Sequence, residues 1–236
     1  INKISGRTRN KFISALRGVS KEAFSIGLID ADQYNRMTVL EHYKGARLPA
    51  GRALSAEEVT EFIEHVECDE RARGVRDAAI ITMLLKTGLR RAELVDLDLS
   101  VYDRKERAIR VLGKGDNQRL VPLSPSATLA LDNWIEVRGD YSGPLFFRID
   151  RWDNLQPEKR LSTSGIYDIV VRRAGQAGIE KISPHDMRRT CLTTLLDKGV
   201  NIDTVASIAG HASVDTTRIY DRGQEKRNKA AVELLD

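Results

Sequence analysis

The residues that could do chemistry lie in five short stretches of the sequence. In the first, Thr87–Leu94 (TGLRRAEL), Arg90 follows a glycine turn at the start of an expected helix. Backbone N–H groups and a guanidinium placed there would converge on an anion. The more ordinary alternative for an isolated arginine is a surface ion pair, here between Arg90 and Glu93.

The next two stretches place a lysine in a turn and a histidine–arginine pair on a helix. Lys114 lies in Gly113–Asn117 (GKGDN), between two expected strands, where glycine permits the positive φ angles of a hairpin. A lysine at such a tip can reach a DNA backbone as a point charge or proton donor, or it can be surface decoration. His185 and Arg188 follow the helix cap Ser183-Pro184. Because residues i and i+3 share a helix face, their side chains are expected to point the same way.

The last two stretches hold a histidine and a tyrosine near the C-terminus. His211 follows Gly210 at the end of an expected helix, and Tyr220 comes later in the frame TTRIYDR. A single histidine is more often a structural residue, and a single tyrosine is more often part of the core. Taken singly, these residues therefore indicate no function.

The sequence predicts that two units position these stretches. Residues 1–45 contain two helical patterns, at about 7–27 and 31–43, which bury little apolar surface on their own and indicate the later part of a larger helical domain. Residues 46–53 contain Pro49, Gly51 and two arginines, and they predict a linker. Residues 54–236 form the second predicted unit.

This second unit is expected to be mainly helical, with one small antiparallel sheet. Ser55 and Glu58 form a capping box for a helix to about Cys68, and a helix over Val75–Lys86 stops where Gly88 can adopt the left-handed conformation. Three short strands are expected at 99–102, 108–111 and 119–122, and further helices at 126–138, 163–177, 185–198, 202–209, 214–219 and 225–235. The predicted fold class is mainly α with a small three-stranded antiparallel β-sheet.

The bulk composition is that of an ordinary globular protein. Of the 236 residues, 41% are hydrophobic and 31% are charged, and the net charge of +4 permits nucleic-acid binding without requiring it. No apolar run approaches the roughly 20 residues that a membrane-spanning helix needs, and no signal peptide is apparent. Cys68 and Cys191 lie far apart, outside any CxxC or Cys/His cluster, so neither a disulfide framework nor a zinc site is indicated.

In combination, the chemical residues occur in frames that resemble the tyrosine recombinase (phage integrase) family, particularly its Xer-like bacterial branch. The frames are TGLRRAEL, GKGDNQRLVPL, PHDMRRT, IAGH and TTRIYDR. The resemblance covers about residues 53–236 and, more loosely, 7–50. Six functional positions in the right order make a specific match, and the resemblance implies the recombinase catalytic-domain fold for residues 54–236.

The resemblance also implies a chemistry, in which DNA is cut and rejoined through a covalent 3′-phosphotyrosine on Tyr220. Arg90 and Arg188 would hold the non-bridging oxygens of the phosphate, where fixed cations stabilise the pentavalent state. The bond to tyrosine would conserve the energy of the phosphodiester, so that resealing needs no ATP.

Three further residues receive roles by the same resemblance. His185 is the implied base for the tyrosine hydroxyl, Lys114 would protonate the leaving 5′ oxygen, and His211 would hydrogen-bond the phosphate. No cofactor and no metal ion is implied, and the sequence contains no carboxylate cluster that would hold a metal.

Partners follow from the family as well. The resemblance implies specific sites on double-stranded DNA, a homotetramer on paired sites that exchanges strands through a Holliday junction, and in some members an accessory DNA-bending protein. Residues 1–45 would be a partial core-binding domain that clamps DNA, and the amphipathic helix at 224–235 would be exchanged between protomers.

The location would be cytoplasmic and nucleoid-associated, without a membrane. Relatives often carry a second histidine where this chain has Arg189.

Alternative functions share parts of this pattern. A type IB topoisomerase uses the same Arg, Lys, Arg, His and Tyr chemistry but relaxes supercoils without exchanging partners; the GKG hairpin, the GH frame and the C-terminal helix favour a recombinase. A DNA-binding accessory protein of the same fold would have lost catalysis, and intact residues at all six positions argue against it. A purely structural helical domain would leave six matched positions to coincidence.

Overall fold

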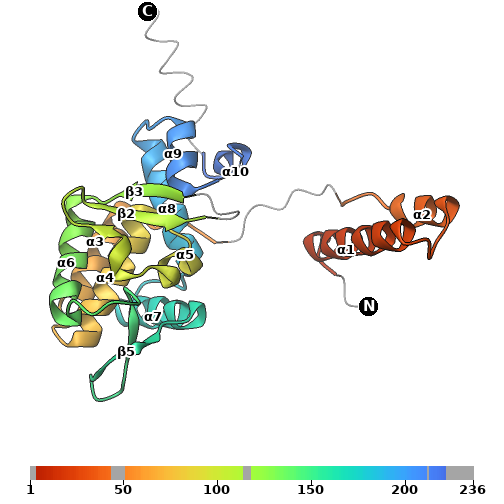
Figure 1. The fold of residues 1–236 in the computed structure, drawn as a ribbon. Coiled ribbons are helices and arrows are strands. Elements are labelled where there is room, and N and C mark those ends of the chain that lie inside the picture. The colour runs from red at the N-terminus through yellow and green to blue at the C-terminus, as the bar shows by residue number, and fades with distance from the viewer. Residues whose placement is uncertain (1–3, 44–50, 114–117, 212, 222–236) are drawn as a thin grey trace, which may run out of the picture. The chain divides into compact units, whose positions relative to one another are not determined.

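The protein divides into two compact units, residues 1–49 and residues 50–236. The structure, a computed structural model, describes residues 4–43, 51–113, 118–211 and 213–221 (Figure 1). The division falls within the segment that the sequence indicates as a linker, most of which lies outside the described residues.

The first unit is a pair of helices, α1 (Gly6–Ser25) and α2 (Ala31–Thr38). The prediction of two helices is confirmed, but α2 ends five residues earlier than the sequence pattern indicated. The reason is that the Arg17 guanidinium donates to the carbonyl oxygens of Thr38 and Leu40, at 3.1 and 2.8 Å, so these groups have partners outside a helix.

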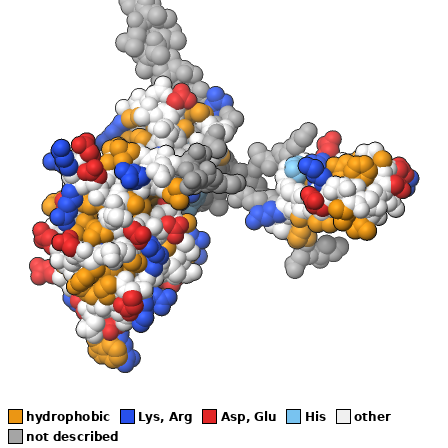
Figure 2. Space-filling view, viewed as in Figure 1, with side chains coloured by type: hydrophobic (Ala, Val, Ile, Leu, Met, Phe, Trp, Pro, Cys, Tyr) orange, Lys and Arg blue, Asp and Glu red, His pale blue; other side chains and the backbone are white. Residues whose placement is uncertain are grey.

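This helix pair buries few of its own apolar side chains. Ile13 is 5% exposed, but Phe12 and Val19 on the same helix are 62% and 68% exposed. Hydrophobic side chains accordingly cover much of the visible surface of this unit (Figure 2). Two helices alone give too thin a layer to enclose a core.

The second unit is built around α4 (Ala72–Thr87), which carries a largely apolar run at Ala78–Leu85 and is buried on nearly all sides. The helices that pack against it are α3 (Ala56–Glu67), α6 (Pro125–Arg138), α7 (Thr163–Gln176) and α8 (Pro184–Asp197) (Figure 1). The capping box predicted at Ser55 and Glu58 is present at the start of α3. These helices enclose one large hydrophobic core.

A three-stranded antiparallel sheet covers this core, in the order β1 (Tyr102–Asp103), β2 (Ala108–Leu112) and β3 (Gln118–Pro122). Ile109 pairs with Val121, and both are buried. The predicted sheet is therefore confirmed, but the position predicted for its first strand, residues 99–102, is mostly wrong. Residues Leu99–Val101 form a 3₁₀ turn, because the Leu99 N–H donates to the carbonyl of Gly143 and not to a neighbouring strand.

A second, two-stranded sheet was not predicted. It pairs β4 (Phe147–Ile149) with β5 (Leu155–Arg160), and a bulge interrupts the ladder between Phe147 and Arg148. The sequence of β5, LQPEKR, has a proline and three charges and lacks a strand-like alternation. The sheet forms because Phe147 anchors β4 in the core, where its ring packs 5.3 Å from that of Trp134.

The C-terminal part of the described chain consists of short helices. After α8 come α9 (Ile202–Ala209) and α10 (Asp215–Arg218), close to the predicted positions, and α5 (Arg91–Asp96) follows α4. The predicted helix at 225–235 and the hairpin tip at 114–117 lie outside the described residues. In the part of the chain that the structure describes, no helix has the length and apolarity that crossing a bilayer requires.

Candidate active site

The candidate site lies where α4 ends and where α5 and α8 begin. Gly88 ends α4 in the left-handed conformation, at φ 64°, and this turn places Arg90 at the N-cap of α5. Ser183 caps α8 with its hydroxyl, and proline occupies the first turn as predicted. Two helix N-termini thus face one region, an arrangement that favours anions.

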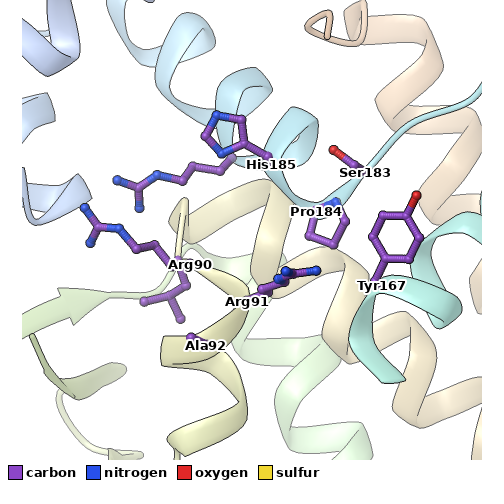
Figure 3. A pocket seen from close by; sticks show the side chains of 9 residues that line it. Arg90, Arg91, Ala92, Tyr167, Ser183, Pro184 and His185 are labelled. Atoms are coloured by element: carbon purple, nitrogen blue, oxygen red, sulfur yellow. The ribbon is translucent and has the colours of Figure 1, made fainter. Parts of the chain in front are cut away.

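A cleft of about 480 Å³ opens at this place. Arg90 lies at one end of it and Tyr167 at the other, with Pro184 between them (Figure 3). The lining residues are Leu89, Arg90, Arg91, Ala92, Tyr167, Ser183, Pro184, His185 and Arg188. Three of the six residues that the sequence singled out therefore line one cleft.

Arg188 is the buried centre of the site, with 3% of its surface exposed. Its guanidinium donates to the carbonyl oxygens of Gly88 and Ala209, and it lies 2.7 Å from Nε2 of His211. Burial, followed by the charge of Arg90, lowers the pKa of Arg188 to about 10. The group therefore keeps its positive charge at neutral pH, in surroundings where a charge acts strongly.

His211 is held between Arg188 and Thr217. A guanidinium can only donate hydrogen bonds, so Nε2 of His211 must accept from Arg188. The neutral imidazole then carries its hydrogen on Nδ1 and donates it to Thr217 Oγ1, at 2.7 Å. Burial and the charge of Arg188 lower the pKa of His211 to about 4, so the ring is neutral at physiological pH.

Arg90 donates to the same helix end as Arg188. Its Nη1 lies 2.8 Å from Oε1 of Glu93 and 3.3 Å from the carbonyl oxygen of Ala209, and its Nη2 lies 3.1 Å from that of Gly210. The ion pair with Glu93 that the sequence offered as an alternative is thus present, but the Glu93 side chain is only 9% exposed. Arg90 can therefore form the ion pair with Glu93 and still take part in an anion-binding site.

One residue of the site, Arg119, had no role in the sequence analysis, and Glu93 was considered there only as an ion-pair partner of Arg90. Glu93 accepts hydrogen bonds from Arg90 and from Arg119, whose guanidinium also donates to the carbonyl oxygen of Ile208. Burial opposes the charge on Glu93, but the bonds from Arg119 and from the backbone N–H of Arg90 outweigh it and lower the pKa of Glu93. In the sequence Arg119 was only the first residue of the strand expected at 119–122, and no local spacing connects it with Glu93.

His185 lies in the first turn of α8, is exposed and lines the cleft on the same side of the helix as Arg188, as the spacing predicted. Lys114 lies outside the described residues. The strands on either side of its hairpin are described, and they pair as far as Leu112 and Gln118.

Tyr220 lies close to this group, although it is absent from the described residues that line the cleft. Its ring is stacked on that of His211, with the centroids 6.2 Å apart and the planes at 12°. The residue is 6% exposed and belongs to a small apolar cluster with Leu192 and Val205. The guanidinium carbon of Arg189 lies 5.7 Å from the centre of the tyrosine ring, within the range of a cation–π contact.

The structure therefore brings four of the sequence-predicted residues into one connected group. Arg90 and Arg188 meet at the carbonyl of Ala209, His211 contacts Arg188, and Tyr220 stacks on His211. Two guanidinium groups beside a neutral imidazole and a tyrosine can bind a phosphate and place a nucleophile next to it.

Comparison with known proteins finds relatives that match most of the chain. Residues 52–227 match the phage integrase family. The tyrosine recombinase XerC of Corynebacterium glutamicum is 35% identical over 179 residues, which are 75% of this chain and 56% of the relative. The tyrosine recombinase XerD of Mycobacterium leprae is 34% identical over 224 residues, 92% of this chain and 70% of the relative. The chain thus spans little more than half of the first relative's length.

Among solved structures, a XerH site-specific recombinase bound to palindromic difH substrate in a post-cleavage complex has a similar fold. The TM-score is 0.75 at 24% identity, and the match covers 99% of this chain and 66% of the other. At this identity the likeness shows the fold alone.

Proposed function

The chain belongs to the phage integrase family of tyrosine recombinases, and from this premise we propose that it is a site-specific DNA recombinase that works through a 3′-phosphotyrosyl bond to Tyr220. The observation that carries the proposal is the convergence of Arg90, Arg188 and His211 at the end of α9, beside the ring of Tyr220. Convergent cations next to a tyrosine suit a phosphodiester as substrate.

Binding of the phosphate follows from the two arginines. Their donors now point at the carbonyl oxygens of Ala209 and Gly210, which are partial negative charges at a helix end. A non-bridging phosphate oxygen carries more charge and would compete for the same donors. As charge builds up on these oxygens in the pentavalent state, fixed guanidinium groups stabilise it more than the ground state, and this difference accelerates the reaction.

The covalent step is a transesterification. The hydroxyl oxygen of Tyr220 attacks phosphorus, the bond from phosphorus to the 5′ oxygen breaks, and a 3′-phosphotyrosine forms. The phenolic proton passes to His185, and the leaving 5′ oxygen takes a proton from Lys114. Attack of a 5′ hydroxyl from the partner strand reverses these steps and restores a phosphodiester, with neither metal nor ATP in the scheme.

His211 would change its hydrogen bonding when the phosphate binds. In the structure its Nε2 accepts from Arg188, so it cannot donate to an oxygen from that atom. A phosphate in contact with Arg188 adds negative charge beside the imidazole, which raises the pKa of His211 from about 4 towards neutrality. Once protonated, the ring can donate to a non-bridging oxygen.

Tyr220 must move before it can attack. Its ring is buried in the apolar cluster with Leu192 and Val205 and lies outside the cleft that Arg90 and Arg188 line. We infer that Tyr220 leaves this cluster when DNA binds, so that its hydroxyl reaches the phosphate.

The partners are part of the same proposal. Double-stranded DNA at specific sites is the substrate, supported by the fold shared with a recombinase bound to its difH substrate. Residues 1–45 would contribute a part of a domain that clamps DNA. Four protomers on paired sites would exchange strands through a Holliday junction, linked by the segment 224–235, with an accessory bending protein where the sites require one.

Covalent capture tests the function. The chain is incubated with fragmented DNA from its source replicon, and complexes that resist SDS are digested with protease and sequenced at their ends. We expect adducts at 3′ phosphates at a defined sequence with the wild type and none with Tyr220→Phe, which removes only the hydroxyl. Adducts at arbitrary sequences, with relaxation of supercoiled plasmid, would indicate a type IB topoisomerase. Specific DNA binding without adducts would indicate a catalytically silent accessory protein.

A further inference from the structure

A second layer of ion pairs lies directly behind Arg90. Each oxygen of the Glu93 carboxylate accepts one hydrogen bond from Arg90 and one from Arg119. Oε1 lies 2.8 Å from Arg90 Nη1 and 3.1 Å from Arg119 Nη1. Oε2 lies 2.8 Å from the backbone nitrogen of Arg90 and 2.9 Å from Arg119 Nη2. Glu93 is therefore a bridge between the two arginines.

This bridge is enclosed by protein. The side chains of Glu93 and Arg119 are 9% and 15% exposed, whereas that of Arg90 is 44% exposed. The guanidinium of Arg119 also donates to the carbonyl oxygen of Ile208 and lies against Gly210, where an added Cβ would come within 2.7 Å of its Nη1. Arg119 is thus held by hydrogen bonds to Glu93 and Ile208 and packs closely against Gly210.

We propose that Arg119 is a positioning residue for DNA strand cleavage: it fixes Glu93, and Glu93 in turn orients the Arg90 guanidinium that binds the phosphate. The inference rests on the proposed function. Arg119 lies outside the described lining of the cleft, so it acts through Glu93 and not by touching the DNA.

The physical argument concerns freedom of rotation. A half-exposed arginine side chain has many rotamers, and holding it in one of them costs conformational entropy. A carboxylate that is itself free to rotate cannot hold Arg90, whereas one clamped by a planar fork on both oxygens can. Arg119 also donates to the end of α9, from which Arg90 and Arg188 receive their other contacts. Through Glu93 and Arg119, the position of Arg90 is therefore fixed by the same helix end that fixes Arg188.

Single-turnover cleavage of a pre-bound duplex, with the site found by covalent capture, measures this role. We expect Arg119→Ala to slow the covalent step by about 10- to 100-fold, as a misplaced catalytic group does, with the Kd for DNA within about threefold of wild type. Arg119→Lys keeps the charge without the fork and is expected to fall between the two. Arg148→Ala, which removes an exposed arginine on β4, serves as the matched control and is expected to cleave normally.

A double-mutant cycle with Glu93→Gln identifies the route. If Arg119 acts through Glu93, Arg119→Ala changes the rate by less than about threefold once Glu93→Gln is present. The pH profile gives a second readout that a merely structural role would not move. Without Arg119 the pKa of Glu93 rises, so the acid limb of the cleavage rate moves to higher pH in Arg119→Ala, and Glu93→Gln abolishes this shift.

The outcomes separate this inference from the function on which it rests. If the wild type forms no adduct, the proposed function fails and the inference fails with it. If the wild type cleaves, three results overturn the inference alone. One is that Arg119→Ala cleaves at the wild-type rate, and another is that the rate losses of Arg119→Ala and Glu93→Gln multiply in the double variant. The third result is that Arg119→Ala binds DNA more weakly but cleaves bound DNA at the wild-type rate. If Arg119→Ala does not fold, as judged by circular dichroism, Arg119→Lys carries the same comparisons.

Discussion

The hydrogen bond between Thr217 and His211 can be removed almost without a change of shape. Thr217 is completely buried, and its Oγ1 lies 2.7 Å from Nδ1 of His211. Thr217→Val keeps the branched side chain and deletes the hydroxyl. Neither tautomer of the histidine then fits: a hydrogen on Nδ1 faces a methyl group, and a hydrogen on Nε2 faces the N–H of Arg188.

The magnitude follows from the burial. A buried polar group left without its partner costs about 1–3 kcal/mol, and we expect the free energy of unfolding to fall by that amount. In the active site the loss releases His211 from its orientation beside the phosphate. One hydrogen bond of about 1.4 kcal/mol to the transition state corresponds to about a tenfold change in rate, so cleavage should slow by at least this factor.

Urea denaturation measures the stability, and single-turnover cleavage at a temperature where both proteins are folded measures the rate. Thr216→Val is the matched control, because it makes the same substitution at an exposed neighbouring position. We expect it to change the free energy of unfolding by no more than about 0.5 kcal/mol. If Thr217→Val matches Thr216→Val in both assays, the assignment of the hydrogen to Nδ1 and the orienting role of Thr217 are wrong.

Three other predictions concern charge. Arg91 lines the cleft, and Arg91→Ala is expected to reduce the slope of log Kd against log salt by about 1 while bound DNA is cleaved normally; an unchanged slope contradicts a phosphate contact. Asp77 is fully buried and accepts hydrogen bonds from three arginines, so Asp77→Ala should lower the free energy of unfolding in urea by about 3–5 kcal/mol. As a control, Glu158→Ala, which removes an exposed ion pair with Lys159, should lower it by less than about 1 kcal/mol. Burial and nearby arginine charge lower the pKa of His211 from 6.5 to about 4; the unfolded chain therefore binds the proton first, and the free energy of unfolding should fall as pH drops through this interval, less steeply in His211→Asn.

Local rules explain why so much of the helical structure could be predicted. The capping box at Ser55 and Glu58, the proline after Ser183 and the left-handed Gly88 each act over a few residues, and all three occur as predicted. The small antiparallel sheet was also predictable, because turn-forming segments at 103–107 and 113–118 separate short runs such as Ala108–Val111 that suit strands.

The errors occur where a distant contact overrides a local preference. Leu99 belongs to an apolar run that suits a strand, but its N–H bonds to Gly143 and the chain turns. The β5 strand has little strand propensity and forms because Phe147 on its partner strand is anchored in the core. Neither contact leaves a periodic signal in the sequence.

The same distinction holds for the candidate site. The family and the six residues to examine can be read from the sequence alone, because each residue is embedded in a short frame such as TGLRRAEL or PHDMRRT. The meeting of Arg90 and Arg188 at one carbonyl oxygen, and the contact of Arg119 with Glu93, became visible in the folded chain. Such pairs are far apart along the chain, and the spacing of residues carries no information on which helix ends will pack together. Their contact is set by the burial of the helices that carry them, and burial is a property of the whole fold.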